Sequence, residues 1–169
     1  MKPKALVIGL NNTFWDINLW EDADLSQENI ANKTFLHAID CLNILKEQYT
    51  LIVAETCETK FIERLAPDHD PEQFEYMGDD FLTDFIKEKL NYIYLKNDFD
   101  LVFCKKYDCG PQKRCILHLL NKKFGYWNHE LMFIDSNIKL LNSLENLNVG
   151  SILIDPCVGI TMEDIDQLL

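Results

Sequence analysis

Five short apolar runs recur along the chain, and longer segments of mixed polarity separate them. Each run is continuously apolar rather than alternating, which is typical of parallel strands that are covered on both faces. The runs are Ala5–Ile8, Leu51–Ala54, Leu101–Phe103, Leu131–Ile134 and Ile152–Ile154. They predict a parallel sheet of about five strands.

The segments between these runs carry apolar residues at helical spacing. The stripes are Phe35, Ile39, Leu42 and Leu45, then Ile116, Leu119, Leu120 and Phe124, then Ile138, Leu141 and Leu144. Gly125 follows the second stripe, where a glycine is typical of a helix end. This alternation predicts an α/β fold with three Rossmann-like layers, in which helices cover both faces of the sheet.

Two segments do not fit this alternation. Residues 16–34 are polar and lack periodicity, so we predict a small flap after the first strand. Residues 67–98 begin with a turn-like run between two prolines and continue at helical spacing, so we predict an acidic helical insertion. The chain has no linker-like tract, and we therefore expect residues 1–169 to form one domain without a large cap.

Composition and charge narrow the classes of function. A chain with 47% hydrophobic and 26% charged residues is ordinary for a globular protein. Its net charge of −12 disfavours nucleic-acid binding, and no apolar run approaches the roughly 20 residues of a membrane span. The six cysteines are scattered, which favours reduced thiols. We expect a cytoplasmic protein that binds neither nucleic acid nor membrane.

The most informative motif follows the first strand, where the chain runs Val-Ile-Gly-Leu-Asn-Asn-Thr-Phe-Trp from Val7 to Trp15. It resembles the first motif of the haloacid dehalogenase (HAD) phosphohydrolases, which is four apolar residues followed by Asp-x-Asp-x-Thr. In this resemblance, Gly9 stands in the place of the nucleophilic Asp and Asn11 in the place of the acid/base Asp. Ligands of open parallel sheets bind beyond the carboxyl ends of the strands, where this motif lies.

Three further segments resemble HAD motifs in the expected order. The run Phe133–Asn137 is similar to the Phe-hydrophobic-Asp-Asp-Asn of the FkbH-like and magnesium-dependent phosphatase branches, with Ser136 in place of the second acid. Lys113, 22 residues before Asp135, opens a predicted helix and resembles the lysine that contacts the phosphoryl group. The Ser or Thr of the second motif falls on Glu55 without a gap, or on Thr56 with a slip of one residue.

The resemblance implies the fold and, at the same time, the loss of its chemistry. The HAD reaction needs a carboxylate that attacks phosphorus, and Gly9 has no side chain. It also needs a general acid/base, whereas Asn11 can only form hydrogen bonds. One metal-binding carboxylate, Asp135, remains, so we expect no cofactor beyond a weakly held magnesium ion.

Several functions remain open at this stage. The leading hypothesis is an inactive pseudophosphatase that acts as an interaction or regulatory module with a protein partner or as a homo-oligomer. A second is a protein that binds a phosphate-containing metabolite at the remnant site. A third is an enzyme that uses Asp135, Glu55 or Cys57 in an unfamiliar arrangement, such as a carboxylate pair formed by Glu55 and Asp135. The residues of the predicted remnant are Asn11, Asn12, Thr13, Glu55, Thr56, Lys113, Asp135, Ser136 and Asn137.

Each of these candidates has a purely structural alternative. Lys113 can pair with Asp135, and Asn11 can satisfy a turn. Glu55 can be a solvated side chain or the neighbour of a helix N-cap, and Cys57 can be a packed, inert thiol. We favour the structural interpretation of the remnant slightly over an anion pocket.

Overall fold

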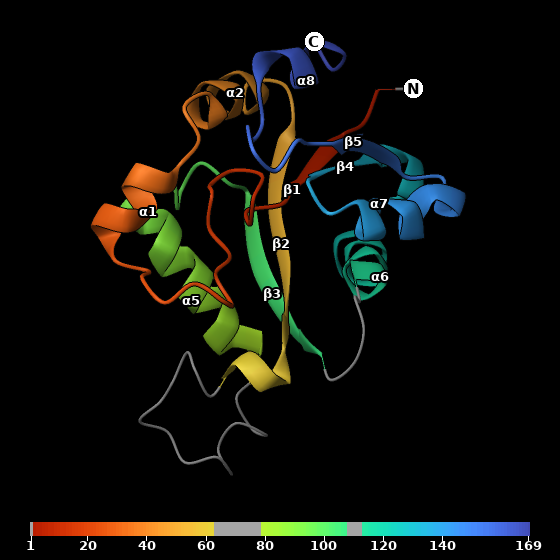
Figure 1. Ribbon diagram of the computed structural model, residues 1–169. Helices are drawn as coiled ribbons and strands as arrows, with labels where there is room; N and C mark the ends of the chain where they lie inside the picture. The colour runs from red at the N-terminus through yellow and green to blue at the C-terminus, as the bar shows by residue number, and fades with distance from the viewer. Residues whose placement is uncertain (1, 63–78, 108–112) are drawn as a thin grey trace.

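A five-stranded parallel sheet forms the centre of the computed structural model, which describes residues 2–62, 79–107 and 113–169. The strand order is β3-β2-β1-β4-β5, and all four pairings are parallel (Figure 1). The strands are β1 (Ala5–Ile8), β2 (Thr50–Glu58), β3 (Leu101–Tyr107), β4 (Leu131–Asp135) and β5 (Gly150–Leu153). The prediction of a parallel sheet is confirmed.

Helices cover both faces of this sheet, as predicted (Figure 1). Successive residues of β1 point to opposite faces, so Leu6 and Ile8 belong to one core cluster while Ala5 and Val7 belong to the other. The first cluster lies under α1 (Gln27–Lys33), α2 (Ala38–Leu45), α5 (Asp79–Tyr92) and α8 (Met162–Asp166). The second lies under α6 (Lys113–Phe124) and α7 (Ile138–Leu144).

Short 3-10 turns complete the described elements: η1 (Thr59–Phe61), η2 (Asn128–Glu130) and η3 (Glu145–Leu147). Gly125 follows α6 with a φ of 75°, which is the left-handed conformation expected at a helix end. No helix in the described ranges has the length and apolar character needed to cross a bilayer.

The predicted helices are present, but two buried faces differ from the predicted stripes. In α2, Ile39 is 38% exposed and Cys41 takes its place in the core. In α7, Ile138 is 52% exposed and Leu140 is buried instead. The reason is that a helix of seven or eight residues is only two turns long, so its apolar spacing is compatible with two adjacent faces.

Strands β2 and β3 extend four residues beyond their apolar runs. Glu55 pairs with Cys104, and Glu58 pairs with Tyr107, in continuous parallel register. Backbone pairing supplies the hydrogen bonds of these residues whatever their side chains, so the polar strand ends carry no hydrophobic signal. The extension brings polar side chains of β2 to the edge of the sheet where ligands bind.

The predicted flap packs tightly against the sheet and α5. Ile17 and Leu19 are buried, and Trp20 stacks on Phe85 of α5 with ring centroids 6.1 Å apart. The segment also contains α1, which begins after the N-cap Ser26 and which the lack of periodicity did not indicate. Of the predicted insertion, residues 63–78 lie outside the described residues, and α5 follows them.

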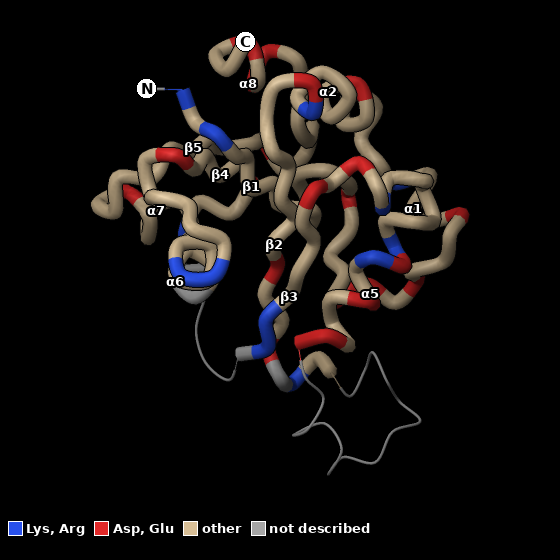
Figure 2. Tube along the Cα trace, turned by 180° about the vertical axis from the view of Figure 1, so that it is seen from behind, with Lys and Arg blue, Asp and Glu red and all other residues tan. Residues whose placement is uncertain are grey.

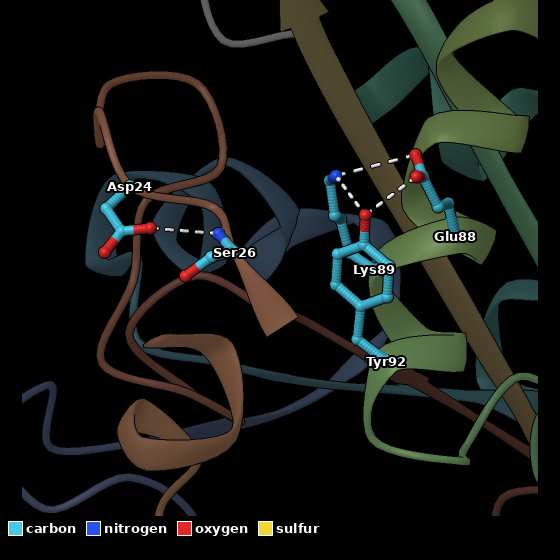
Figure 3. Close-up of polar contacts among 5 residues, drawn as sticks. All are labelled: Asp24, Ser26, Glu88, Lys89 and Tyr92. Atoms are coloured by element: carbon cyan, nitrogen blue, oxygen red, sulfur yellow. Dashed lines mark hydrogen bonds and ion pairs between the residues drawn. The ribbon is translucent and has the colours of Figure 1, made fainter. Parts of the chain in front are cut away.

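A buried lysine extends the Trp20–Phe85 stack along α5. The ammonium of Lys89 lies 4.9 Å from the ring centre of Phe85 and 4.6 Å from that of Tyr92. Figure 3 shows that the Tyr92 hydroxyl and the Glu88 carboxylate lie beside this ammonium, and the hydroxyl donates to Glu88 at 2.8 Å. The apolar stem of Lys89 therefore contributes to the packing beneath the flap while its charge keeps polar partners.

Within the flap, a turn held by a side-chain hydrogen bond precedes α1. The Ser26 backbone N–H donates to Asp24 Oδ1 at 3.0 Å, as Figure 3 also shows. Hydrogen bonds from the Ser26 side chain and backbone lower the pKa of the Asp24 carboxyl. A carboxylate just before a helix N-terminus also interacts favourably with the helix dipole.

Candidate functional site

A sharp turn follows β1 at the carboxyl end of the sheet. Gly9 continues the sheet, since its N–H donates to the Ile134 carbonyl at 2.9 Å. The Leu10 carbonyl then accepts from the N–H groups of Thr13 and Phe14 at 3.2 and 3.0 Å. Asn12 has a φ of 54°, a conformation that asparagine tolerates better than most residues. The predicted motif thus forms one compact turn.

A cavity of about 360 Å³ opens beside this turn, beyond the ends of β1, β2 and β4. Of the predicted remnant residues whose side chains the structure describes, all except Thr13 line it. The lining residues are Asn11, Asn12, Asn18, Trp20, Glu55, Thr56, Asp135, Ser136, Asn137, Leu140 and Pro156. Sequence reasoning missed Asn18 and Trp20, which lie in the aperiodic flap, and Pro156, which the rule that ligands bind beyond strand ends would have found.

Asp135 occupies the space in which a side chain at position 9 would begin. A Cβ atom built on Gly9 would lie 2.4 Å from Asp135 Oδ2 and 2.7 Å from its Cγ. The carboxylate is 4% exposed, and its Oδ1 accepts from the Asn137 N–H at 2.9 Å. A glycine at position 9 is therefore a requirement of the present packing.

Asn137 connects this carboxylate to the helix that follows. Its side-chain Oδ1 accepts from the Leu140 N–H at 3.2 Å, which makes Asn137 the N-cap of α7. The same residue thus holds Asp135 with its backbone and starts α7 with its side chain. Both functions are satisfied within the protein, although Asn137 also lines the cavity.

Thr13 is fully buried and is not among the residues that line the cavity. Its hydroxyl lies 3.1 Å from Ser136 Oγ and accepts from the Ser136 N–H at 2.9 Å. Ser136 Oγ in turn donates to the Asn11 carbonyl at 3.2 Å. These bonds join the turn after β1 to the end of β4, so the two hydroxyls stabilise the fold.

Glu55 is buried, which corrects the expectation of a solvated side chain or a helix neighbour. It lies in the extended part of β2, is 5% exposed, and accepts from the Leu10 N–H through Oε1 at 2.9 Å. Glu55 and Asp135 both line the cavity, as the carboxylate-pair hypothesis requires. The geometry thus gives Glu55 a position beside the cavity and a structural bond to the turn after β1.

Cys57 is a packed thiol rather than a nucleophile. It lies near the end of β2, is fully buried, and therefore has no helix N-terminus to favour its thiolate. Burial, with a smaller contribution from Glu58, raises the pKa of Cys57 to about 12. A raised pKa favours the protonated thiol, which supports the interpretation of Cys57 as a packed, inert thiol.

The charge of the site is set by its two carboxylates. Among the described side chains that line the cavity there is no lysine or arginine. Lys113 begins α6, but its side chain lies outside the described residues. Magnesium prefers octahedral oxygen coordination, and in the described part of the chain no three His, Cys, Asp or Glu side chains gather as metal ligands.

Comparison with solved structures gives this architecture a context. A chain described as a predicted HAD-like family hydrolase from Porphyromonas gingivalis superposes with a TM-score of 0.55 at 14% identity, covering 99% of this chain and 98% of that chain. The fold is HAD-like. A chain of a Pnkp1/Rnl/Hen1 complex superposes on 90% of this chain with a TM-score of 0.50 at 16% identity.

The likeness concerns the fold alone, because both identities are low. The match covers 46% of the chain from the Pnkp1/Rnl/Hen1 complex, so the present chain spans about half the length of that chain. No protein-family model and no curated protein matches the sequence. The function of the HAD-like chain must therefore be argued from its own site.

Proposed function

We propose that this HAD-like chain is a pseudophosphatase that works by binding, as an interaction or regulatory module. The observation that carries the proposal is the close approach of Asp135 Oδ2 to the position of a Gly9 Cβ, at 2.4 Å. The site has not only lost a nucleophile, since a carboxylate from β4 fills the vacated space. The run from Phe133 to Asn137 supports a place near the FkbH-like or magnesium-dependent phosphatase branch.

The residue in the acid/base position has also acquired a structural function. Asn11 Oδ1 accepts from the Leu19 N–H at 3.1 Å and so holds the flap against the turn after β1. An amide in this position cannot transfer a proton to a leaving group. This hydrogen bond supports the structural alternative for Asn11, in which its side chain satisfies a turn.

A phosphatase assay of the purified chain tests this proposal. With p-nitrophenyl phosphate and magnesium, we expect no turnover above the uncatalysed rate, because Gly9 has no side chain that could form the covalent intermediate. Asp135→Ala serves as the control for contaminating phosphatases, whose activity it leaves unchanged. Magnesium-dependent turnover that the wild type shows and Asp135→Ala lacks would overturn the proposal.

The cavity favours a second candidate function, which is binding of a small ligand. Its lining of amides, hydroxyls and two carboxylates can form many hydrogen bonds in a volume of about 360 Å³. A phosphate would meet Glu55 and Asp135, so its binding would depend on Lys113, which begins α6.

A thermal-shift experiment with inorganic phosphate at millimolar concentration separates these possibilities. We expect no increase in Tm, because the described lining is anionic. Lys113→Ala is the matched variant. An increase in Tm for the wild type that Lys113→Ala abolishes would establish phosphate binding instead.

A further inference from the structure

The two edges of the sheet are treated differently, and this difference points to an interaction surface. The β3 edge is covered by α5, whose Thr83 hydroxyl accepts from the Cys104 N–H at 3.0 Å. Asp79 Oδ1 accepts from the Lys106 N–H at 2.8 Å. Figure 2 shows charged segments of β3 and α5 side by side at this edge. Such covering blocks pairing with another strand.

The β5 edge has no comparable cover in the described part of the chain. The Ile154 N–H donates to the Asp135 carbonyl at 3.0 Å, so alternate residues of β5 point their backbone groups toward β4. The N–H groups of Ser151 and Leu153 then point outward, and no described residue accepts from them. The strand is Gly-Ser-Ile-Leu, without the charge or proline that usually protects an open edge.

A shelf of mixed polarity made by α7 runs along this open edge, as Figure 1 shows for the two elements. A hollow of about 220 Å³ lies between one face of α7 and β5. It is lined by Ile138, Leu141, Asn142, Glu145, Ser151 and Leu153. Ile138 is 52% exposed and Leu153 is 49% exposed, so two large apolar side chains flank unpaired backbone groups.

We propose that β5 pairs antiparallel with β5 of a second copy of this chain, about a two-fold axis, so that two sheets become one. An uncharged strand edge is self-complementary in this arrangement. Four residues bury too little surface for a stable dimer, so the α7 shelves must also meet.

Charge complementarity between the two ends of α7 favours a second copy of this chain as the partner that binds the β5 edge. Lys139 lies in the first turn of α7, and Glu145 lies at its end. Two-fold antiparallel pairing runs the two α7 helices in opposite directions and brings Lys139 toward Glu145 of the partner subunit. The inference goes beyond the proposed function and does not depend on what the cavity binds.

Sedimentation velocity of the full chain, from nanomolar to high micromolar concentration, tests the dimer. We expect the wild type to approach twice the monomer mass. Leu153→Lys should raise the dimer dissociation constant by about tenfold or more. Ser151→Pro should do the same while leaving the bonds to β4 intact, because the N–H that it removes points outward. Circular dichroism confirms that both variants fold.

Val158→Lys is the matched control, because Val158 is 53% exposed and lies outside β5. It makes the same change of charge and should leave the dimer unchanged. A wild type that remains monomeric at the highest concentration overturns the proposal. So does a dimer that persists unchanged in both edge variants.

A charge-swap series tests the two-fold arrangement. Lys139→Glu and Glu145→Lys should each weaken the dimer, because each places like charges opposite one another. The double variant restores both pairs and should regain dimer affinity. Single variants that each bind as tightly as the wild type would contradict the antiparallel arrangement, even if a dimer forms through another surface.

Discussion

Gly9→Ala is expected to lower the free energy of unfolding by about 1–3 kcal/mol, which is the usual cost of overpacking a well-packed site. The new Cβ would lie 2.4 Å from Asp135 Oδ2, well inside contact distance. Asp135 cannot simply rotate away, since its Oδ1 accepts from the Asn137 N–H at 2.9 Å and the residue is 4% exposed. Gly9→Asp should cost more, because it also places two carboxylates together.

Urea unfolding of a double-mutant cycle measures this effect. Asp135→Ala removes the three atoms nearest to a Cβ at Gly9, and is itself expected to cost about 1–3 kcal/mol because the Asn137 N–H loses its acceptor. Gly9→Ala should cost much less in that background than alone. Additive effects, or Gly9→Ala within about 0.5 kcal/mol of the wild type, would show that Asp135 does not fill the vacated space.

The same contact changes what a return to the HAD motif requires. A carboxylate restored at position 9 would have to displace Asp135, which lies 126 residues later in the sequence but on the neighbouring strand. The side chain that position 9 can carry and the placement of Asp135 are therefore coupled.

The position of the site could be predicted from the sequence because parallel strands bring their carboxyl ends to one edge. That rule predicts Asn11, Glu55 and Asp135 at one edge of the sheet, and all three line one cavity there. The rule says nothing about the direction of a side chain at the strand end. Thr13 belongs to the same edge, but it is fully buried and does not line the cavity.

Other features lacked a signal in the sequence altogether. The polar ends of β2 and β3 form strands through backbone pairing, which leaves no apolar pattern. Helix α1 has one buried residue, Ile30, so its stability comes from its capped start and its packing rather than from an amphipathic stripe. The contact between Gly9 and Asp135 requires strand adjacency, which a single sequence does not give.

Glu55 offers the second large effect, because it determines the shape of the turn after β1. Glu55→Leu is expected to lower the free energy of unfolding by about 2–3 kcal/mol, since the fully buried Leu10 N–H loses its acceptor at 2.9 Å. Glu55→Gln retains an acceptor oxygen and should cost less than about 1 kcal/mol. Glu55→Gln removes the charge alone, so the difference in free energy of unfolding between the two variants reports the contribution of the hydrogen bond.

Urea unfolding gives both free energies, and hydrogen exchange of the Leu10 amide reports directly on the bond. We expect faster exchange in Glu55→Leu and near-normal exchange in Glu55→Gln. Glu58→Leu and Glu58→Gln form the matched control in the same strand, where a partly exposed side chain pairs with Lys60 and contributes about 0–1 kcal/mol. Equal free energies of unfolding for Glu55→Leu and Glu55→Gln would show that the hydrogen bond to the Leu10 N–H does not stabilise the turn. The presence of Glu55 and Asp135 in one cavity would then be better explained by a ligand that binds there.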